Sequence, residues 1–246
     1  MLARAARHAK VSLMATPQST NPRSTNKRRA VVWVLLLCLV VYRVFHIPPA
    51  AADRIRASVA LYWPLYASAA IWVLFSIYWE IAAKNAAQEK SSESSPSRGL
   101  HVLMTNAALL LLFVPVPGLT RRYLPAPQVL VLIGLIIQLS GLLLAIWARR
   151  HLGRNWSGRI TIKVDHELVK SGPYRWVRHP IYTALLAMYA GTALVSGEWH
   201  ALLGFALAAF AYWRKIRMEE ANLSVAFGAD WDDYRRSTGS LLPGLF

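Results

Sequence analysis

The segment from Gly153 to Tyr182 is polar, basic and rich in aromatic and turn residues, although apolar stretches flank it on both sides. Its sequence is GRNWSGRITIKVDHELVKSGPYRWVRHPIY. Most connections between helices are shorter than about 12 residues, and longer structured loops often hold binding or catalytic groups. This segment is therefore the first candidate for a functional site.

The end of the segment predicts a turn at residues 171–173, an extended piece and then a helix that begins at Pro180, because proline is favoured at the first helical position. His179 then lies at the helix N-terminus, where free backbone N–H groups and the positive end of the helix dipole gather. It is either a capping residue at the membrane interface or a ligand-binding group. Four neighbours are typical of a membrane edge, two as cationic anchors and two as an aromatic belt: Arg175, Arg178, Tyr174 and Trp176.

Two adjacent carboxylates, Glu219 and Glu220, lie near the end of the last long helical stretch, which Gly228 is expected to terminate. Lys215 precedes Glu219 by one helical turn, so an ion pair on the helix surface is one interpretation. The other interpretation, a ligand-binding role, follows from where this end of the helix is expected to lie. This end of the helix is expected beside the 153–182 loop, where the carboxylates would face a cavity and offer charge to a cationic ligand.

The motifs that the sequence lacks exclude several kinds of site. His151, His166 and His179 have no cysteine or carboxylate at the spacing of a metal site. There is no phosphate-binding loop, no dinucleotide-binding glycine motif and no nucleophile elbow. The sequence therefore predicts no metal, and it favours chemistry on a bound small molecule without a protein nucleophile.

These groups must be positioned by membrane helices, because 55% of the 246 residues are hydrophobic and they gather in long runs. A helix that spans a bilayer needs about 20 predominantly apolar residues. Six runs approach that length: 31–47, 58–83, 101–118, 127–148, 181–196 and 199–213. The predicted fold is an all-α integral membrane protein, a bundle of five to six transmembrane helices.

The last two runs lie close together in the sequence and predict a tight C-terminal helical hairpin. Stripes of small residues on both runs favour close packing of the two helices on each other. These residues are Ala184, Ala187 and Gly191 on the first run, and Ala201, Gly204, Ala208 and Ala211 on the second. Such a hairpin would fix His179 relative to Glu219. Gln138 and Glu80 are weaker candidates, as polar groups at membrane depth.

The net charge of +16 is distributed unevenly over the two sides of this topology. With a cytoplasmic N-terminus, nearly all of the 28 Lys and Arg residues fall on the inner side, and the exceptions are Arg43, Arg54, Arg56, Arg121 and Arg122. This is the positive-inside pattern, and it predicts that both termini and the 149–178 loop are cytoplasmic. The basic charge then meets anionic membrane lipids, and the sequence has no module typical of nucleic-acid binding. Three regions follow: a basic disordered cytoplasmic tail (1–29), N-terminal transmembrane helices (30–125) and a C-terminal core (126–246).

Three blocks in the C-terminal half resemble one known family. The order of these blocks is that of the isoprenylcysteine carboxyl methyltransferase family and its phospholipid methyltransferase relatives. The blocks are the segment HELVKSGPYRWVRHPIY, the acidic pair in RKIRMEEANLSVAFG, and an aromatic residue followed by DYRR. The similarity covers residues 127–246. It implies an integral membrane methyltransferase with a cofactor-binding loop and pocket facing the cytoplasm. Such an enzyme binds S-adenosylmethionine and takes a lipophilic acceptor from the bilayer.

The resemblance also implies site residues, position by position. The expected contacts to S-adenosylmethionine are His166, Glu167, Leu168, Val169, Tyr174, His179, Pro180, Ile181, Tyr182 and Glu219. The expected substrate contact is Lys215, where eukaryotic members have an arginine, and a lysine cannot hold a carboxylate with two parallel hydrogen bonds. Ala184 stands where the family usually has a glycine.

Four functions are compatible with the sequence. The leading hypothesis is methylation of the carboxylate of an isoprenylcysteine-like acceptor. The alternatives are N-methylation of a phospholipid amine, NADPH-dependent reduction of a sterol-type substrate, and a non-enzymatic membrane scaffold. A carboxylate acceptor needs no general base, whereas an amine must first lose a proton, for which His179 or a tyrosine is the candidate base.

Overall fold

A computed structural model describes residues 52–84, 95–125, 128–153, 156 and 168–244. The chain divides into two units, Met1–Arg43 and Val44–Phe246, and the description concerns the second. The predicted tail at 1–29 and the predicted span at 31–47 lie outside the described residues.

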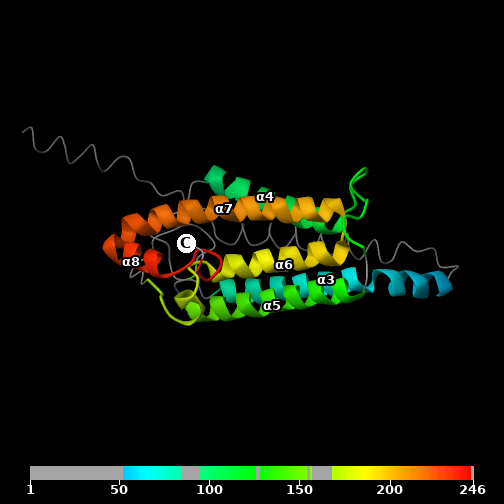
Figure 1. Ribbon diagram of the computed structural model, residues 1–246, viewed down its shortest axis with the longest axis horizontal. Helices are drawn as coiled ribbons and strands as arrows, with labels where there is room; N and C mark the ends of the chain where they lie inside the picture. The colour runs from blue at the N-terminus through cyan, green and yellow to red at the C-terminus, as the bar shows by residue number, and fades with distance from the viewer. Residues whose placement is uncertain (1–51, 85–94, 126–127, 154–155, 157–167, 245–246) are drawn as a thin grey trace, which may run out of the picture. The chain divides into compact units, whose positions relative to one another are not determined.

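The described residues form helices and no strand, which confirms the all-α prediction (Figure 1). The long helices run alongside one another, and the short C-terminal helix lies at one end of them (Figure 1). The elements are α3 (Ala52–Ala83), α4 (Ser95–Phe113), α5 (Gln128–Leu152), the 3₁₀ helix η2 (Gly172–Arg175), α6 (Pro180–Ser196), α7 (Trp199–Phe227) and α8 (Ala229–Ser237).

Each predicted span that falls on described residues overlaps one of these helices, although the predicted span 101–118 runs past the end of α4 at Phe113. Two stretches are long and apolar enough to cross a membrane, Tyr62–Ala83 within α3 and Gln128–Leu152, which is α5. Helix α6 is apolar but shorter. The total of five to six spans therefore stays a prediction.

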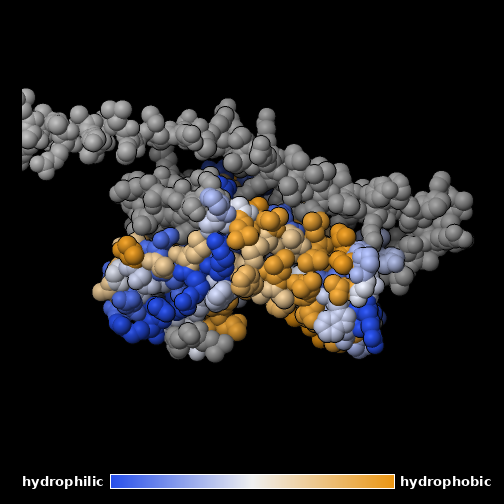
Figure 2. Space-filling view, turned by 90° about the horizontal axis from the view of Figure 1, so that it is seen from above, coloured by the Kyte–Doolittle hydropathy of each residue, from blue (hydrophilic) through white to orange (hydrophobic). Residues whose placement is uncertain are grey.

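Large apolar side chains on several helices face outward. Among the most exposed are Leu74 and Ile81 on α3, Ile136 and Leu143 on α5, and Phe210 and Trp213 on α7. Figure 2 shows hydrophobic residues gathered along the middle of the described surface, with hydrophilic residues toward both ends. An apolar surface of this extent is unusual for a protein in water, and it suits contact with lipid.

The small residues of α6 serve its packing against α5. A Cβ atom added to Gly191 would lie 2.5 Å from the carbonyl oxygen of Gly134, and one added to Gly141 would lie 2.6 Å from that of Ala184. On α7, a Cβ added to Gly204 would lie 2.7 Å from the carbonyl oxygen of Ala108 on α4. Only glycine allows backbones to approach this closely.

The prediction that these stripes pack α6 and α7 on each other is therefore wrong, because each stripe faces another helix. Helix α6 packs mainly against α5, and α7 mainly against α4, although only Gly197 and Glu198 connect α6 to α7. The sequence shows which residues are small but not which helix each stripe faces, and the adjacency of the two helices in the chain suggested the wrong pairing.

Gln138 lies at the centre of a buried polar network rather than at a site. Its side-chain N–H donates to the carbonyl oxygen of Ser68 over 2.9 Å, and its Oε1 accepts from the Ser68 hydroxyl over 2.8 Å. The same hydroxyl lies 3.1 Å from that of Thr192, which also accepts from the indole of Trp72. Buried polar groups without partners are costly, so this network ties α3, α5 and α6 together.

The short connection at Gly197 brings the two candidate segments to the same end of the bundle. Gly197 ends α6 with φ at 65°, a conformation that glycine adopts without strain. At about 1.5 Å per residue, the start of α6 is about 25 Å from the turn, and Glu219 on α7 is about 30 Å from it. His179 and Glu219 are therefore neighbours, as predicted.

Candidate functional site

His179 occupies the N-cap of α6, and Pro180 is the first residue of that helix, as predicted from the sequence. The predicted turn at 171–173 opens the 3₁₀ helix η2, where Gly172 has φ at 59°. Gly228 ends α7, also as predicted. The RHPIY segment meets α7 at Glu219 and Glu220, about two turns before that helix ends.

Glu220 binds two cationic or potentially cationic side chains. Its Oε1 accepts hydrogen bonds from Nε of Arg178 over 2.9 Å and from Nε2 of His179 over 3.1 Å. Burial acts to raise the pKa of Glu220, but the hydrogen bonds and charges of His179 and Arg178 outweigh it and hold the pKa at about 2. Because the carboxylate is ionised and only accepts, Nε2 of His179 must carry a hydrogen. A neutral His179 then has its lone pair on Nδ1.

Glu219 has a different environment from its neighbour. Its Oε2 accepts a 2.7 Å hydrogen bond from the hydroxyl of Tyr182, and within the described part of the chain its Oε1 has no hydrogen-bond partner. The Tyr182 ring stacks on His179, with ring centroids 5.5 Å apart and planes inclined by 15°, and it lies 5.3 Å from the ring of Tyr212. Glu219 is thus a carboxylate beside aromatic rings with one oxygen left for a ligand.

Tyr174 in η2 is buried, so it does not belong to an exposed aromatic belt as the sequence suggested. Burial and the negative charge of Glu219 raise its pKa well above the ordinary tyrosine value, so its hydroxyl stays protonated. The hydroxyl of Tyr234 on α8 donates to the backbone carbonyl oxygen of Tyr174 over 2.6 Å. Trp176, by contrast, is 49% exposed, and its place in an aromatic belt stays a prediction.

The prediction that Arg178 is a membrane-edge anchor is wrong. Its side chain is only 3% exposed, so it is not a membrane-edge anchor, and its guanidinium is held by Glu220. The available signal was its position directly before His179, together with the need of two adjacent carboxylates for a counter-charge. Arg175 is exposed and lies over the ring of Trp176, as a residue at a membrane edge would.

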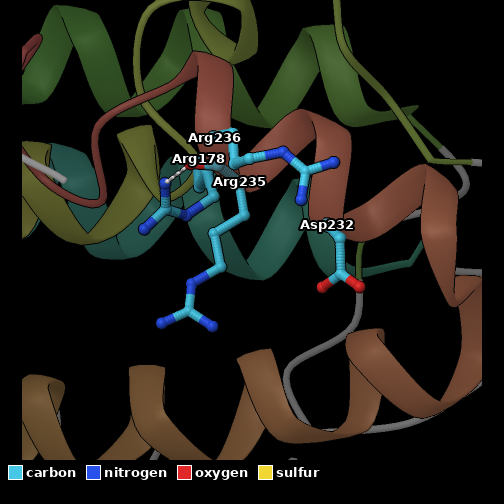
Figure 3. Close-up of a pocket in the computed structure, with 4 residues that line it drawn as sticks. All are labelled: Arg178, Asp232, Arg235 and Arg236. Atoms are coloured by element: carbon cyan, nitrogen blue, oxygen red, sulfur yellow. Dashed lines mark hydrogen bonds between the residues drawn. The ribbon is translucent and has the colours of Figure 1, made fainter.

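A pocket of about 400 Å³ is lined by Arg178 (Figure 3), the residue whose guanidinium binds Glu220. Its other lining residues come from α8: Asp232, Arg235 and Arg236. The charge of Arg178 is offset by Glu220, and that of Arg236 by Asp233, with which it forms an ion pair. The pocket is therefore less positive than its three guanidinium groups suggest.

The remaining predicted site residues differ in how far the structure places them. Pro180 and Ile181 are buried in the first turn of α6, and Lys215 is buried on α7 one turn before Glu219. Leu168 and Val169 are partly buried and lead into η2. His166 and Glu167 lie outside the described residues. In the part of the chain that the structure describes, no cluster of side chains is suited to hold a metal ion.

Residues 132–225 match the sequence pattern of the isoprenylcysteine carboxyl methyltransferase (ICMT) family. A protein-S-isoprenylcysteine O-methyltransferase from Schizosaccharomyces pombe is 35% identical over 80 residues, which are 32% of this chain and 34% of that protein. Methanethiol S-methyltransferase 2 from Bradyrhizobium diazoefficiens is 43% identical over 75 residues, which are 30% of this chain and 27% of that protein. The chain spans about a third to a half of the length of the first curated relatives that it matches.

The fold is shared with a solved structure of the eukaryotic intramembrane Ras methyltransferase ICMT. The TM-score is 0.54 at 20% sequence identity, and the match covers 88% of this chain and 75% of that one. The matched sequence segment contains His179, Tyr182 and both carboxylates, which the structure brings into contact. The resemblance first seen in the motifs is confirmed over residues 132–225, which are similar in sequence to the isoprenylcysteine carboxyl methyltransferase family.

Proposed function

We propose that this protein is an integral membrane methyltransferase that uses S-adenosylmethionine to methylate the carboxylate of a lipophilic, isoprenylcysteine-like acceptor. The observation that carries the proposal is that the family-like segment, residues 132–225, contains both halves of one site, the start of α6 and the end of α7. The curated relatives named protein-S-isoprenylcysteine O-methyltransferase support this choice of acceptor.

The side chains fit such a cofactor. S-adenosylmethionine carries a sulfonium and an ammonium group, and the open oxygen of Glu219 next to the ring of Tyr182 suits a cation in a setting of low dielectric. Glu220 is already neutralised by Arg178, so Glu219 is the carboxylate left for a ligand. The proposed contacts are those that the resemblance implies, from His166 to Val169, Tyr174, the segment 179–182 and Glu219.

The bound cofactor supplies an electrophilic methyl group, and the chain supplies placement. The hydrogen bond from Tyr182 fixes the orientation of Glu219, and the ring of Tyr212 packs beside that of Tyr182. Displacement on a methyl group needs in-line placement and a desolvated nucleophile. Lys215, buried one turn before Glu219, offers a positive charge to the acceptor's carboxylate.

A second acceptor is favoured by one observation. The relative with 43% identity is named a methanethiol S-methyltransferase, so a small thiol is the alternative nucleophile. A thiol must lose its proton to react, and Nδ1 of His179 is the ring nitrogen with a lone pair when Nε2 donates to Glu220. A phospholipid amine has the same requirement.

Two measurements on purified protein test the proposal. Equilibrium binding of labelled S-adenosylmethionine, with NADPH as the control ligand, tests the cofactor, and binding of NADPH alone would contradict it. Incubation with labelled cofactor and a farnesylated cysteine analogue, followed by mild alkali, should release volatile methanol from a methyl ester. Label that survives alkali on a thiol or an amine would instead support the alternative acceptors.

A further inference from the structure

Arg178 joins three parts of the chain that are distant in sequence. Its Nε donates to Glu220 at the end of α7. Its Nη1 donates to the carbonyl oxygen of Arg235 over 3.0 Å and also to that of Thr238. A guanidinium group is suited to this role, because its donors point in fixed directions within one plane.

The residues that follow α8 form a strap, defined here as Thr238–Leu241, across the start of α6. The backbone N–H of Arg178 donates to Gly239 over 2.9 Å, and that of His179 donates to Ser240 over 3.1 Å. The hydroxyl of Thr183 donates to the carbonyl oxygen of Leu241 over 2.7 Å. The strap thus supplies acceptors to donors at and just before the first turn of α6.

The two sets of contacts support each other. The strap holds the backbone on either side of the Arg178–His179 bond, while the Arg178 side chain holds the strap and Glu220 together. Glu220 in turn fixes the ring of His179, on which Tyr182 stacks. The geometry around Glu219 therefore depends on groups that need not contact a ligand.

We infer that Arg178 is a positioning residue: by locking the C-terminal strap and Glu220 to the start of α6, it sets the affinity of the Glu219 site for its ligand. The inference rests on the proposed function only in naming S-adenosylmethionine as that ligand. Losing a charge-assisted contact that fixes a binding site should weaken ligand binding about tenfold or more.

The test uses the protein in detergent and two variants that remove the lock, defined here as the contacts of Arg178 and the strap that join Glu220 to the start of α6. Arg178→Ala removes the guanidinium, and a chain ending at Ser237 removes the strap. Arg217→Ala is the matched control, because Arg217 is exposed on α7, and a chain ending at Pro243 is the control for shortening. Dissociation constants for labelled S-adenosylmethionine are measured by calorimetry. Hydrogen exchange within α5 and α6 shows whether each variant is folded.

Both lock-removing variants should bind the cofactor about tenfold or more weakly while the controls stay within about twofold of wild type. In Arg178→Ala, free guanidinium ion at millimolar concentration should restore part of the affinity, and Arg178→Lys should be intermediate. The His179 amide should exchange faster in both variants. Wild-type affinity in both, or no recovery with guanidinium, would overturn the positioning role. Failure of the wild type to bind would instead refute the proposed cofactor, and the exchange of the His179 amide would still test the lock.

Discussion

Tyr182 donates its phenolic hydrogen to Oε2 of Glu219 over 2.7 Å, although the two residues belong to different helices. This contact joins the first turn of α6 to the end of α7. Among the described residues, none forms a hydrogen bond with the other oxygen of Glu219, whereas the neighbouring carboxylate of Glu220 is bound by Arg178 and His179.

Replacing Glu219 by Gln should weaken S-adenosylmethionine binding about 10- to 100-fold, because a charge-assisted contact to a cation is lost in a partly buried setting. The side chain keeps its shape and its acceptor for Tyr182. Calorimetric titration measures the effect. Asp230→Asn, on the exposed surface of α8, is the charge-matched control. Equal affinity in the Glu219 and Asp230 variants would make Glu219 a surface residue without a role in binding.

Replacing Tyr182 by Phe should lower affinity for the same cofactor by a smaller factor, about fivefold. The ring still stacks on His179, but the hydrogen bond that orients Glu219 is gone, and this loss reaches the ligand only through the orientation of Glu219. The combined variant with Glu219→Gln should be less than additive, since both changes act on the same contact. Full additivity would show that Tyr182 acts independently of Glu219.

The ion pairs of Glu220 should make folding sensitive to acid. Its pKa is lowered from 4.5 to about 2, so the stability that it contributes is fully present above pH 4.5 and is lost as the pH falls toward about 2. Thermal unfolding in detergent should therefore give a higher melting temperature for wild type than for Glu220→Gln at pH 6. This difference should become smaller as the pH falls from 4.5 toward 2. A gap of constant size from pH 6 to pH 2 would exclude this coupling.

Replacing Gly191 by Ala should lower the free energy of unfolding by about 1–3 kcal/mol, because the new Cβ would lie 2.5 Å from the carbonyl oxygen of Gly134 and force α5 and α6 apart. Gly99→Ala is the matched control on α4, where a Cβ meets nothing within 4 Å. That change should leave stability unchanged or raise it slightly. Denaturation in mixed detergent micelles measures both variants, and a stable Gly191 variant would show that the helices are not tightly packed there.

The proposed orientation can be tested by labelling single cysteines in cells, after Cys38 is replaced by Ser. The side chains of Thr120, between α4 and α5, and of Ser237, the last residue of α8, are both exposed. The α4–α5 connection and α8 lie at opposite ends of the bundle (Figure 1). If the site faces the cytoplasm, an impermeant maleimide should label Thr120→Cys in intact cells and Ser237→Cys only after lysis. The reverse pattern would invert the topology.

Features encoded by neighbouring residues were predictable from the sequence. Proline at position 180 marks the start of α6, and glycine at position 228 marks the end of α7, because each residue suits one backbone conformation at a helix end. The meeting of His179 with the acidic pair also followed, since two helices joined by a short turn must bring their far ends together.

Contacts between elements distant in the chain were not predictable in the same way. Gly191 looks the same in sequence whichever helix it faces, and its true partner is Gly134 on α5. Arg178 has the composition of a membrane-edge residue, and its burial depends on Glu220 and on carbonyl groups near the C-terminus. Main-chain acceptors leave no trace in residue identity, so the strap had no signal in the sequence.

The way in which the strap is attached sets what kind of variation it tolerates. Gly239, Ser240 and Leu241 all accept through their carbonyl oxygens, which every amino acid possesses. Substitutions at these positions should therefore be accepted widely among related proteins. A single inserted or deleted residue between α8 and the strap would shift every carbonyl group away from its hydrogen-bond donor. Natural selection should therefore preserve the length of this segment rather than its amino-acid identities.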